Sequence, residues 1–214
     1  MAAQSGVTHI VDDEEPIRDA LAWLLKAHDF ASRLHASAEV FLAHIAMDPA
    51  QCARPGCVVL DIRMPGAHGD ALFDRIRKEN LCPAWPVIFL TGHGDIAMAV
   101  EALKAGAFDF VEKPFNDASF IERIEAALAE SARRLKRASE VASLEERLAT
   151  LTPREREVMD LVVAGHYNKV IADKLDIVPR TVEFFRARIF DKMGVKSAIE
   201  LASLLASSDR SRER

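Results

Sequence analysis

This sequence of 214 residues lacks three features, and each absence excludes a class of protein or site. No run of eighteen apolar residues occurs, so we expect no segment that spans a membrane. The first fifteen residues, MAAQSGVTHIVDDEE, turn acidic where a secretory signal peptide needs an apolar core, which indicates a cytoplasmic protein. The three cysteines, Cys52, Cys57 and Cys82, match no metal-binding or redox spacing, so we expect three reduced thiols.

The sequence also lacks a strong excess of either charge, with a net charge of −5. Residues 1–118 hold 10 Lys or Arg and 17 Asp or Glu, residues 119–148 hold 6 of each, and residues 149–214 hold 12 and 10. An acidic first part and a mildly basic last part indicate different partners for the two ends. The basic excess alone is too small to indicate nucleic acid. The length suits two small domains.

Residues 7 to about 128 alternate between strand-like and helix-like segments. The apolar strand-like segments are THIVDD, FASRLH, CVVLD, PVIFLTG and FDFVEKP. The helix-like segments between and after them are PIRDALAWLLKAH, AEVFLAHI, GDALFDRIRKEN, DIAMAVEALKAG and a longer one from about Ala118. Five such units predict an α/β domain, in which helices cover both faces of a parallel sheet.

Polar residues follow several of these strands, at the edge of the sheet where ligands bind in such folds. They are Asp12, Asp13, Asp61, Thr91 and Lys113. Three carboxylates close together repel one another, and a divalent cation relieves that repulsion. Oxygen ligands favour Mg²⁺. The set suits a phosphoryl group on Asp61, with its oxygens held by Mg²⁺, Lys113 and the Thr91 hydroxyl.

Four stretches in this part, VDDEEPIRDAL, VLDIRMPG, VIFLTGHGD and AGAFDFVEKPF, resemble the receiver domain of two-component response regulators. The resemblance implies a flavodoxin-like fold with five strands, and a histidine kinase that phosphorylates Asp61. It further implies a Mg²⁺ site formed by Asp12, Asp13, Asp61 and the backbone carbonyl of Arg63. The switch pair would be Thr91 and Phe110, and Lys113 would bind the phosphoryl group.

The same resemblance implies how phosphorylation acts at a distance. The phosphoryl group would draw Thr91 toward it, Phe110 would turn inward, and a surface that includes Val100, Lys104 and Phe110 would form a homodimer. Arg63 and His93 flank the phosphoryl site. Two interpretations of this flanking pair stay open, namely that they tune hydrolysis of the phosphoryl group or that they are solvated loop residues.

Residues 118–149 contain neither proline nor glycine, which favours one long amphipathic helix. Its apolar residues are Ile121, Leu128, Leu135, Leu144, Leu148 and, just beyond, Leu151. Their spacing near seven fits either a short coiled-coil seam or a single helix that packs on its own domains. We therefore predict a receiver domain at 1–127, a helical linker at 128–148 and a further domain at 149–214.

The last part contains closely spaced helices that predict a helix-turn-helix. Thr152, followed by Pro153 and by Glu155, forms a capping box that starts the first helix, and Gly165 ends it. NKVIADKL is a short helix, and Pro179 opens a longer one that runs to Met193. An ordinary helical bundle is the alternative interpretation of this pattern.

The segments LTPRERE, NKVIADKL and RTVEFFRARIFDKMG resemble the all-α, four-helix DNA-binding domain of the LuxR/NarL type. Together the two parts resemble the FixJ-like subgroup of response regulators. Carried over residue by residue, the resemblance implies contacts with double-stranded DNA by Asn168, Lys169, Arg180, Thr181, Glu183, Phe184, Ala187, Arg188 and Lys192. The sequence departs from the family pattern at Val170, Val178, Phe184 and Phe185, which puts the usual DNA contacts in question.

We therefore predict a transcription regulator without enzyme activity, whose dimerisation and DNA binding depend on phosphorylation. Two alternatives stay open. The first is a signalling module that acts through protein contacts and does not bind DNA. The second is an aspartyl-phosphate phosphatase, although such enzymes need a second Asp where this chain has Arg63.

Overall fold

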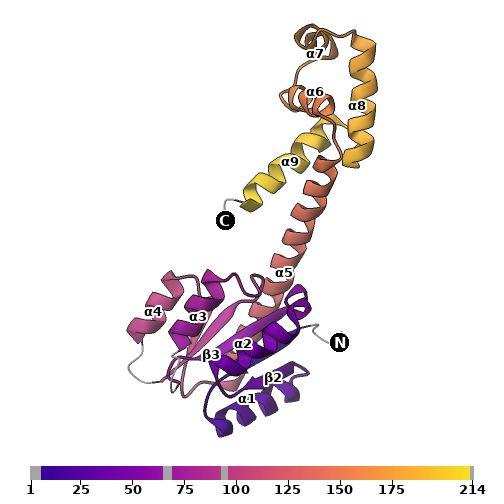
Figure 1. The fold of residues 1–214 in the computed structure, drawn as a ribbon. Coiled ribbons are helices and arrows are strands. Elements are labelled where there is room, and N and C mark those ends of the chain that lie inside the picture. Colours follow the sequence, from indigo (N-terminus) through magenta and orange to yellow (C-terminus); the bar gives the residue numbers. More distant parts are fainter. Residues whose placement is uncertain (1–5, 65–68, 93–95, 213–214) are drawn as a thin grey trace. The chain divides into compact units, whose positions relative to one another are not determined.

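Five parallel strands form the centre of the N-terminal part of the chain (Figure 1). They are β1 (Val7–Val11), β2 (Ala31–His35), β3 (Gly56–Asp61), β4 (Val87–Thr91) and β5 (Asp109–Glu112). Their spatial order is β2-β1-β3-β4-β5, so the chain reverses direction across the sheet between β1 and β3. This computed structural model describes residues 6–64, 69–92 and 96–212, and in it the predicted five-stranded flavodoxin-like sheet is confirmed.

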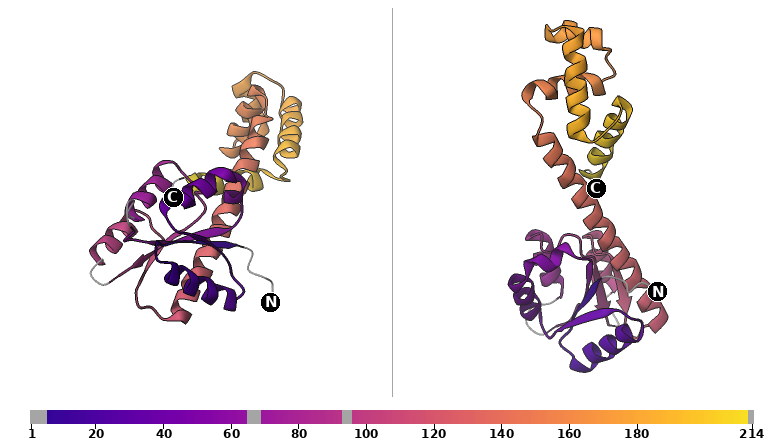
Figure 2. Two further views of the ribbon diagram at one scale, coloured as in Figure 1. Left: turned by 60° about the horizontal axis from the view of Figure 1, so that its bottom comes forward. Right: turned by 90° about the vertical axis from the view of Figure 1, so that its right-hand side faces the viewer.

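Helices cover both faces of this sheet, as Figure 2 shows. On one face lie α1 (Glu15–Ala27) and the first part of α5 (Asp117–Ala149), which bury Leu25 and Phe120 against the sheet. On the other face lie α2 (Ala38–Met47), α3 (Gly69–Lys78) and α4 (Ile96–Lys104), with Phe41 and Phe73 in the core. The strands alternate between these two cores, because successive side chains of a strand point to opposite faces.

Two glycines fix the path of the chain at opposite ends of the sheet. Gly69 begins α3 directly against β3, and a Cβ at this position would lie 2.2 Å from the carbonyl oxygen of Asp61. Only glycine therefore allows α3 to start there. Gly106 ends the turn after α4 with φ +99°, a left-handed conformation that glycine adopts without strain. Gly69 thus places α3 beside the strand ends that carry the polar side chains, whereas Gly106 leads the chain from α4 into β5 at the amino-terminal end of the sheet.

The helix α5 is continuous over 33 residues, as the lack of proline and glycine predicted. Its apolar residues pack on the chain's own cores. Ile121 and Leu128 contact the core under α1, Leu135 contacts the core under α2 and α3, and Leu144 contacts the C-terminal core. This packing favours the single helix over the coiled-coil seam among the two interpretations.

The C-terminal part contains four helices after α5: α6 (Pro153–Val163), α7 (Asn168–Leu175), α8 (Pro179–Met193) and α9 (Ala198–Arg212). The capping box of Thr152 and Glu155 is present at the start of α6. Their common core includes Val158, Ile171, Val182, Ile189, Met193 and Leu201. Packing divides the chain into two compact units, Met1–Lys136 and Arg137–Arg214; the predicted boundaries at 127/128 and 148/149 stay a prediction.

The expectation of three reduced thiols is wrong for two of the cysteines. Cys52 in the short helix η1 (Pro49–Ala53) and Cys82 in the loop before β4 form a disulfide, with their Cα atoms 4.7 Å apart. Cys57 is a free, buried thiol. A separation of 30 residues says nothing about distance in space, so spacing motifs could not reveal this pair. Within the described ranges, no helix is long and apolar enough to cross a membrane.

Candidate functional site

A partly buried ammonium group joins two carboxylates at the carboxyl end of the sheet. Lys113, directly after β5, places its Nζ 2.7 Å from Asp61 Oδ1 and 3.0 Å from Asp12 Oδ2. Asp12 is fully buried and Asp61 nearly so. The three residues lie at the carboxyl ends of β1, β3 and β5, and the reversal of strand order between β1 and β3 opens the crevice in which they meet. The structure therefore brings together three residues that the sequence placed at strand ends.

The backbone holds both carboxylates in place. Arg63 N donates to Asp61 Oδ2 at 2.7 Å, and Glu14 N donates to Asp12 Oδ1 at 2.8 Å. Arg18 Nη1 donates to the carbonyl oxygen of Asp12 at 2.8 Å. Arg18 was missed in the sequence because an Arg on an exposed helix carries no signal of its own. These bonds leave each carboxylate with a fixed orientation toward Lys113.

The charges of the cluster are not balanced, because one ammonium group serves two carboxylates. Burial raises the pKa of Asp61 above its ordinary value, and the nearby charge of Asp12 adds to this effect against the opposing influence of Lys113. Burial by itself would lower the pKa of Lys113, but its hydrogen bonds to Asp61 and Asp12 raise it. A further positive charge beside Asp61 would relieve the remaining repulsion.

The fit of this site to Mg²⁺ rests on few protein ligands. Among the described residues, no group of three His, Cys, Asp or Glu side chains is close enough to hold a metal ion, and the predicted third carboxylate, Asp13, is exposed. Mg²⁺ commonly takes only one or two carboxylates and keeps several waters. Asp12 and Asp61, with a backbone carbonyl, therefore suit Mg²⁺ better than they suit an ion that needs a full cage of side chains.

The predicted switch pair lies on neighbouring strands beside this cluster. Thr91 is the last residue of β4 and is buried, and its Oγ1 donates to the carbonyl oxygen of Gly92 at 3.0 Å. Phe110 on β5 is paired in register with Phe89 on β4 and is partly buried. The acceptor of the Thr91 hydroxyl is thus the carbonyl oxygen of the next residue in the chain. His93, the other flanking residue predicted, lies outside the described residues.

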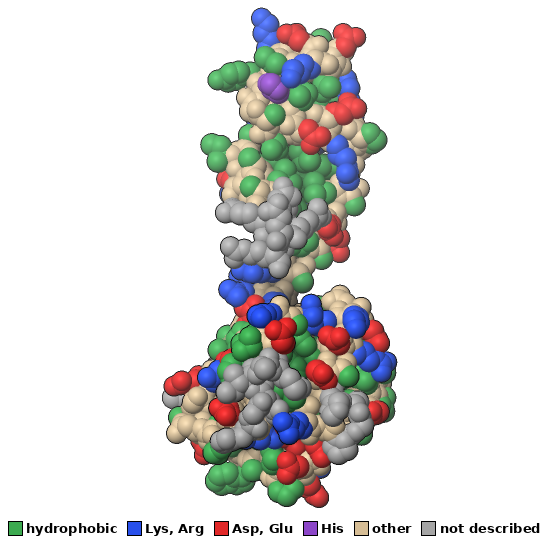
Figure 3. Space-filling model, turned by 90° about the vertical axis from the view of Figure 1, so that its left-hand side faces the viewer, with side chains coloured by type: hydrophobic (Ala, Val, Ile, Leu, Met, Phe, Trp, Pro, Cys, Tyr) green, Lys and Arg blue, Asp and Glu red, His purple; other side chains and the backbone are tan. Residues whose placement is uncertain are grey.

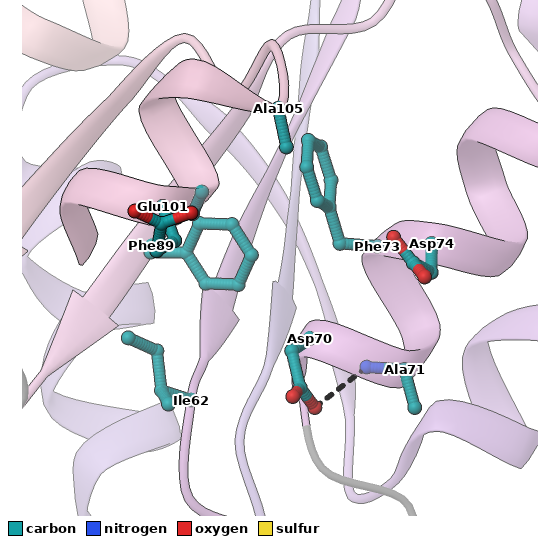
Figure 4. A pocket seen from close by; sticks show the side chains of 9 residues that line it. Ile62, Asp70, Ala71, Phe73, Asp74, Phe89, Glu101 and Ala105 are labelled. Atoms are coloured by element: carbon teal, nitrogen blue, oxygen red, sulfur yellow. Dashed lines mark hydrogen bonds between the residues drawn. The ribbon is translucent and has the colours of Figure 1, made fainter. Parts of the chain in front are cut away.

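A cleft of about 610 Å³ separates α3 from α4 (Figure 4). Ile62, the neighbour of Asp61, and the rings of Phe73 and Phe89 line its apolar part. Asp70 and Glu101 lie on its two sides, and Asp70 Oδ1 accepts from Ala71 N at 2.7 Å. The cleft leaves space between α4 and the strand ends near Asp61. Val100 on α4 is 40% exposed, and Lys104 pairs with Glu101 at 3.0 Å.

A second, mostly apolar groove adjoins Lys113. It is lined by Ile17, Leu21 and Trp23 of α1 and by Phe115 after β5. Trp23 is 74% exposed, the most exposed large aromatic side chain of the described N-terminal unit. This surface was not predicted from the sequence, although an exposed Trp at the edge of an amphipathic helix is a signal for it.

In the C-terminal unit, the predicted DNA-binding residues lie on two helices of a helix-turn-helix. Arg180, Phe184, Ala187 and Arg188 share the outward side of α8, at spacings of four, seven and eight residues, and all four are exposed. Glu183 and Lys169 are also exposed, whereas Asn168 and Thr181 are partly buried. Figure 3 shows hydrophobic side chains between cations and anions on one face of this unit.

Two of the predicted phosphate contacts have partners within the unit. Lys192 Nζ donates to Glu155 Oε2 at 2.6 Å and to the carbonyl oxygen of Thr150 at 2.9 Å. Arg188 Nε lies 3.4 Å from Glu155 Oε1, and its guanidinium lies over the ring of Phe184 at 5.5 Å. The carboxylate of Glu155 therefore also binds two side chains of α8. The sequence indicated this residue only as a helix cap. A phosphate contact by Lys192 stays a prediction.

Known proteins resemble both units of the chain. The family model of the response regulator receiver domain matches residues 8–125, and the model of bacterial regulatory proteins of the luxR family matches residues 149–205. The transcriptional regulatory protein FixJ of Rhizobium meliloti (strain 1021) is 46% identical over 198 residues, which cover 92% of this chain and 93% of FixJ.

Further relatives and solved structures agree with these matches. The C4-dicarboxylate transport transcriptional regulatory protein DctR of Rhodobacter capsulatus is 45% identical, covering 94% of this chain and 99% of DctR. The structure of the response regulator StyR matches with a TM-score of 0.83 at 34% identity, over 95% of this chain and 99% of StyR. Full-length FixJ from B. japonicum matches with a TM-score of 0.58 at 38% identity, over 96% and 98%.

Proposed function

The chain belongs to the response regulators that join a receiver domain to a LuxR-family DNA-binding domain and regulate transcription, and from this premise we propose that phosphorylation of Asp61 controls its activity. The observation that carries the proposal is the contact of Lys113 Nζ with both Asp61 and Asp12 at the carboxyl end of the sheet. A buried carboxylate beside a fixed cation and a second acid suits an acceptor of a phosphoryl group.

The phosphoryl group comes from a histidine kinase in this proposal. A carboxylate oxygen of Asp61 attacks phosphorus, the bond between phosphorus and the donor histidine nitrogen breaks, and the phosphoryl group ends on Asp61. Lys113 can follow one of the new oxygens, because its Nζ already lies 2.7 Å from Asp61 Oδ1. Receiver domains generally bind Mg²⁺, and here Asp12, Asp61, Asp13 and the carbonyl of Arg63 would hold it. When bound, the ion neutralises charge on the transferring group.

The kinase has to approach the surface around Lys113. The groove beside Lys113, with Ile17 and Trp23 on its α1 side, offers exposed apolar area at this place. A partner that delivers the phosphoryl group would cover Trp23 as it reaches Asp61. Aromatic residues of this kind commonly carry much of the binding energy at an interface.

The conformational response begins at Thr91 in this proposal. Its hydroxyl leaves the Gly92 carbonyl for a phosphoryl oxygen, and Phe110 turns toward the vacated space. The cleft between α3 and α4 supports this step, since α4 has free volume beside it. Val100, Lys104 and Phe110 then form the surface on which two chains pair.

The DNA-binding unit reads two half-sites when the chains are paired. Arg180, Arg188 and Lys169 would contact phosphates, together with Asn168, Thr181 and Lys192. Such contacts position the protein and do not read the sequence. Glu183, Phe184 and Ala187 would face the base edges, where Glu accepts from cytosine and Phe contacts a thymine methyl group. The exposure of these three side chains supports this assignment.

The test of the proposed phosphorylation site uses a small phosphodonor with Mg²⁺ and the full-length chain. Asp61→Asn should lose all labelling, because the amide cannot accept the phosphoryl group, and Asp13→Ala should need more Mg²⁺ for the same labelling. Asp70→Asn is a matched control, since Asp70 is an exposed acid on the adjacent helix α3. If Asp61→Asn is labelled as well as Asp70→Asn, the site assignment is wrong.

A further inference from the structure

Two cysteines from separate segments meet at the amino-terminal end of the sheet, far along the strands from Asp61. Cys52 lies four residues before β3 begins at Gly56, and Cys82 lies five residues before β4 begins at Val87. Their Cα atoms are 4.7 Å apart, and the segment between them contains β3, Asp61 and α3. The pair therefore closes a loop around the strand that carries the phospho-acceptor.

Contacts other than the disulfide hold the two segments together. Within the segment of Cys82, Trp85 N donates to the carbonyl oxygen of Cys82 at 2.8 Å. From there Trp85 Nε1 donates to the carbonyl oxygen of Arg54, in the segment of Cys52, at 2.8 Å. Gly56 leaves the space for this indole, since a Cβ there would lie 2.6 Å from the Trp85 ring. The two sulfur atoms thus stay neighbours when the bond between them is broken. Closure is then an intramolecular step with a high effective concentration.

The two cysteines differ in their access to solvent. Cys52 is partly exposed, whereas Cys82 is 6% exposed. An external thiolate or disulfide therefore meets the sulfur of Cys52 first. The third cysteine, Cys57, is fully buried, and burial raises the pKa of its thiol to about 12. Cys57 consequently provides an inert internal reference, because the thiolate is the reactive form.

We propose that Cys52 and Cys82 form a reversible redox modification site whose co-substrate is a low-molecular-mass disulfide such as glutathione disulfide. The Cys52 thiolate attacks the co-substrate, forms a mixed disulfide and releases one thiolate. The Cys82 thiolate then attacks the Cys52 sulfur, the intramolecular bond forms, and the second thiolate leaves. Two protons pass from the cysteines to the two released thiols, so one disulfide is reduced as one is made.

The state of this site bears on the anchoring of α5. Gly56 N, at the start of β3, donates to Ser131 Oγ of α5 at 3.1 Å. Leu135, one turn further along α5, packs on the core cluster that contains Cys82 and Trp85. The disulfide joins the two segments that contact Ser131 and Leu135 of α5. Oxidation should therefore hold α5 more firmly at residues 131–135, where the helix leaves the N-terminal unit. Disulfides in reducing compartments are usually transient and redox-sensing, and a regulator bound to chromosomal DNA works in such a compartment.

The first test equilibrates the full-length protein with glutathione buffers of increasing oxidised fraction, then counts alkylated cysteines after denaturation. The reduced chain should take three alkyl groups and the oxidised chain one, on Cys57. The Cys52→Ser variant should take the same number of alkyl groups in every buffer, whereas the Cys57→Ala variant should still take two fewer alkyl groups when it is oxidised. In a Trp23→Phe background, Trp85 is the remaining tryptophan and should report the same midpoint by its fluorescence. Three alkyl groups in every buffer would overturn the proposal.

The second test measures amide hydrogen exchange in α5 for both redox states. Residues 131–136 should exchange more slowly in the oxidised chain than in the reduced chain. The Cys52→Ser variant should match the reduced chain in every buffer. Equal exchange of oxidised and reduced wild type would refute the link between this site and α5.

Discussion

The carboxylate of Glu155 offers a quantitative test of how the DNA-binding unit is held together. Glu155 is 1% exposed, accepts from Thr152 N at 2.8 Å and from Lys192 Nζ at 2.6 Å, and lies 3.4 Å from Arg188 Nε. The hydrogen bond from Lys192, followed by the one from the Thr152 backbone, lowers the pKa of Glu155 from 4.5 to about 2. Glu155 is therefore charged at neutral pH in spite of its burial.

The change to test is Glu155→Gln, which keeps the shape and one acceptor of the capping box but removes the charge. A fall of the pKa from 4.5 to about 2 corresponds to about 3 kcal/mol of stability at neutral pH. Because the amide still accepts from Thr152 N, we expect a loss of about 2–3 kcal/mol. The folded pKa lies below the unfolded one, so this stability is present above pH 4.5 and is lost as the pH falls toward 2.

Native-state hydrogen exchange of amides in α6 and α8 reports the free energy of unfolding of this unit at pH 7 within the full chain. Calorimetry at pH 7 and pH 3 adds the acid dependence, and the gap between wild type and Glu155→Gln should narrow by about 2 kcal/mol at pH 3. Glu157→Gln is the control, since Glu157 is half-exposed and pairs with Arg154 on the surface. It should cost under about 1 kcal/mol. Equal costs for both variants, or a gap that does not change with pH, would refute the reasoning.

Three further predictions concern the two units and their partners. Burial, and then the charge of the neighbouring histidines, lowers the pKa of His9 to about 3. Burial, followed by the charges of His44 and Arg33, lowers the pKa of His35 to about 4. The neutral form of each histidine should therefore stabilise the fold above pH 6.5, and at pH 5 each should lower the free energy of unfolding by about 2 kcal/mol. Urea unfolding followed by Trp fluorescence should show this loss of stability in wild type and in the control His28→Gln, which changes an exposed histidine. The double variant His9→Phe/His35→Leu should not show the loss, and an unchanged loss in that variant would contradict the prediction. A phosphate mimic should raise the mass of the full chain to that of a dimer in sedimentation, and Val100→Asp should prevent this by placing a charge on the pairing surface; a mutant that still shifts would show that the surface is wrong. Arg188→Ala should weaken DNA binding about equally on all sequences and lower the salt slope by about one, whereas Glu183→Ala should change the preferred base by roughly 1–3 kcal/mol at one position; salt titrations on matched and mismatched sites distinguish them, and the reverse pattern would mean that α8 lies differently in the groove.

The meeting of Asp12, Asp61 and Lys113, the proposed phosphoryl site, was predictable because parallel strands have a simple geometry. Apolar runs that end in Asp12, Asp61 and Lys113 must place these residues at one edge of the sheet, and the side-chain contacts follow from that placement. The capping box of Thr152 and Glu155 was equally predictable, since both partners lie within one helical turn.

Contacts between residues far apart in the sequence were not predictable from pattern. The bond between Lys192 and Glu155 joins residues 37 apart, and the hydrogen bond between His9 Nδ1 and His35 Nε2 at 3.0 Å joins residues 26 apart. Local periodicity carries no information about such distances. The disulfide of Cys52 and Cys82 was missed for the same reason, because Cys52 lies in the short helix η1 and Cys82 in a loop, and the two segments meet through the packing of Trp85.

The departures from the LuxR pattern affect the recognition helix less than the sequence suggested. Val178 gives α8 no side-chain cap, but Pro179 occupies the first turn, where it fits without loss of a hydrogen bond, and Thr181 N bonds to the Val178 carbonyl at 2.9 Å. Phe185 packs on the C-terminal core, so of the two phenylalanines only Phe184, at 56% exposure, adds apolar surface to the outward side. The guanidinium of Arg188 lies over that ring and orients it. Because α8 keeps its fold and differs on its outward side at one aromatic residue, we expect it to keep a surface that contacts DNA, and this argues against the alternative that the unit does not bind DNA.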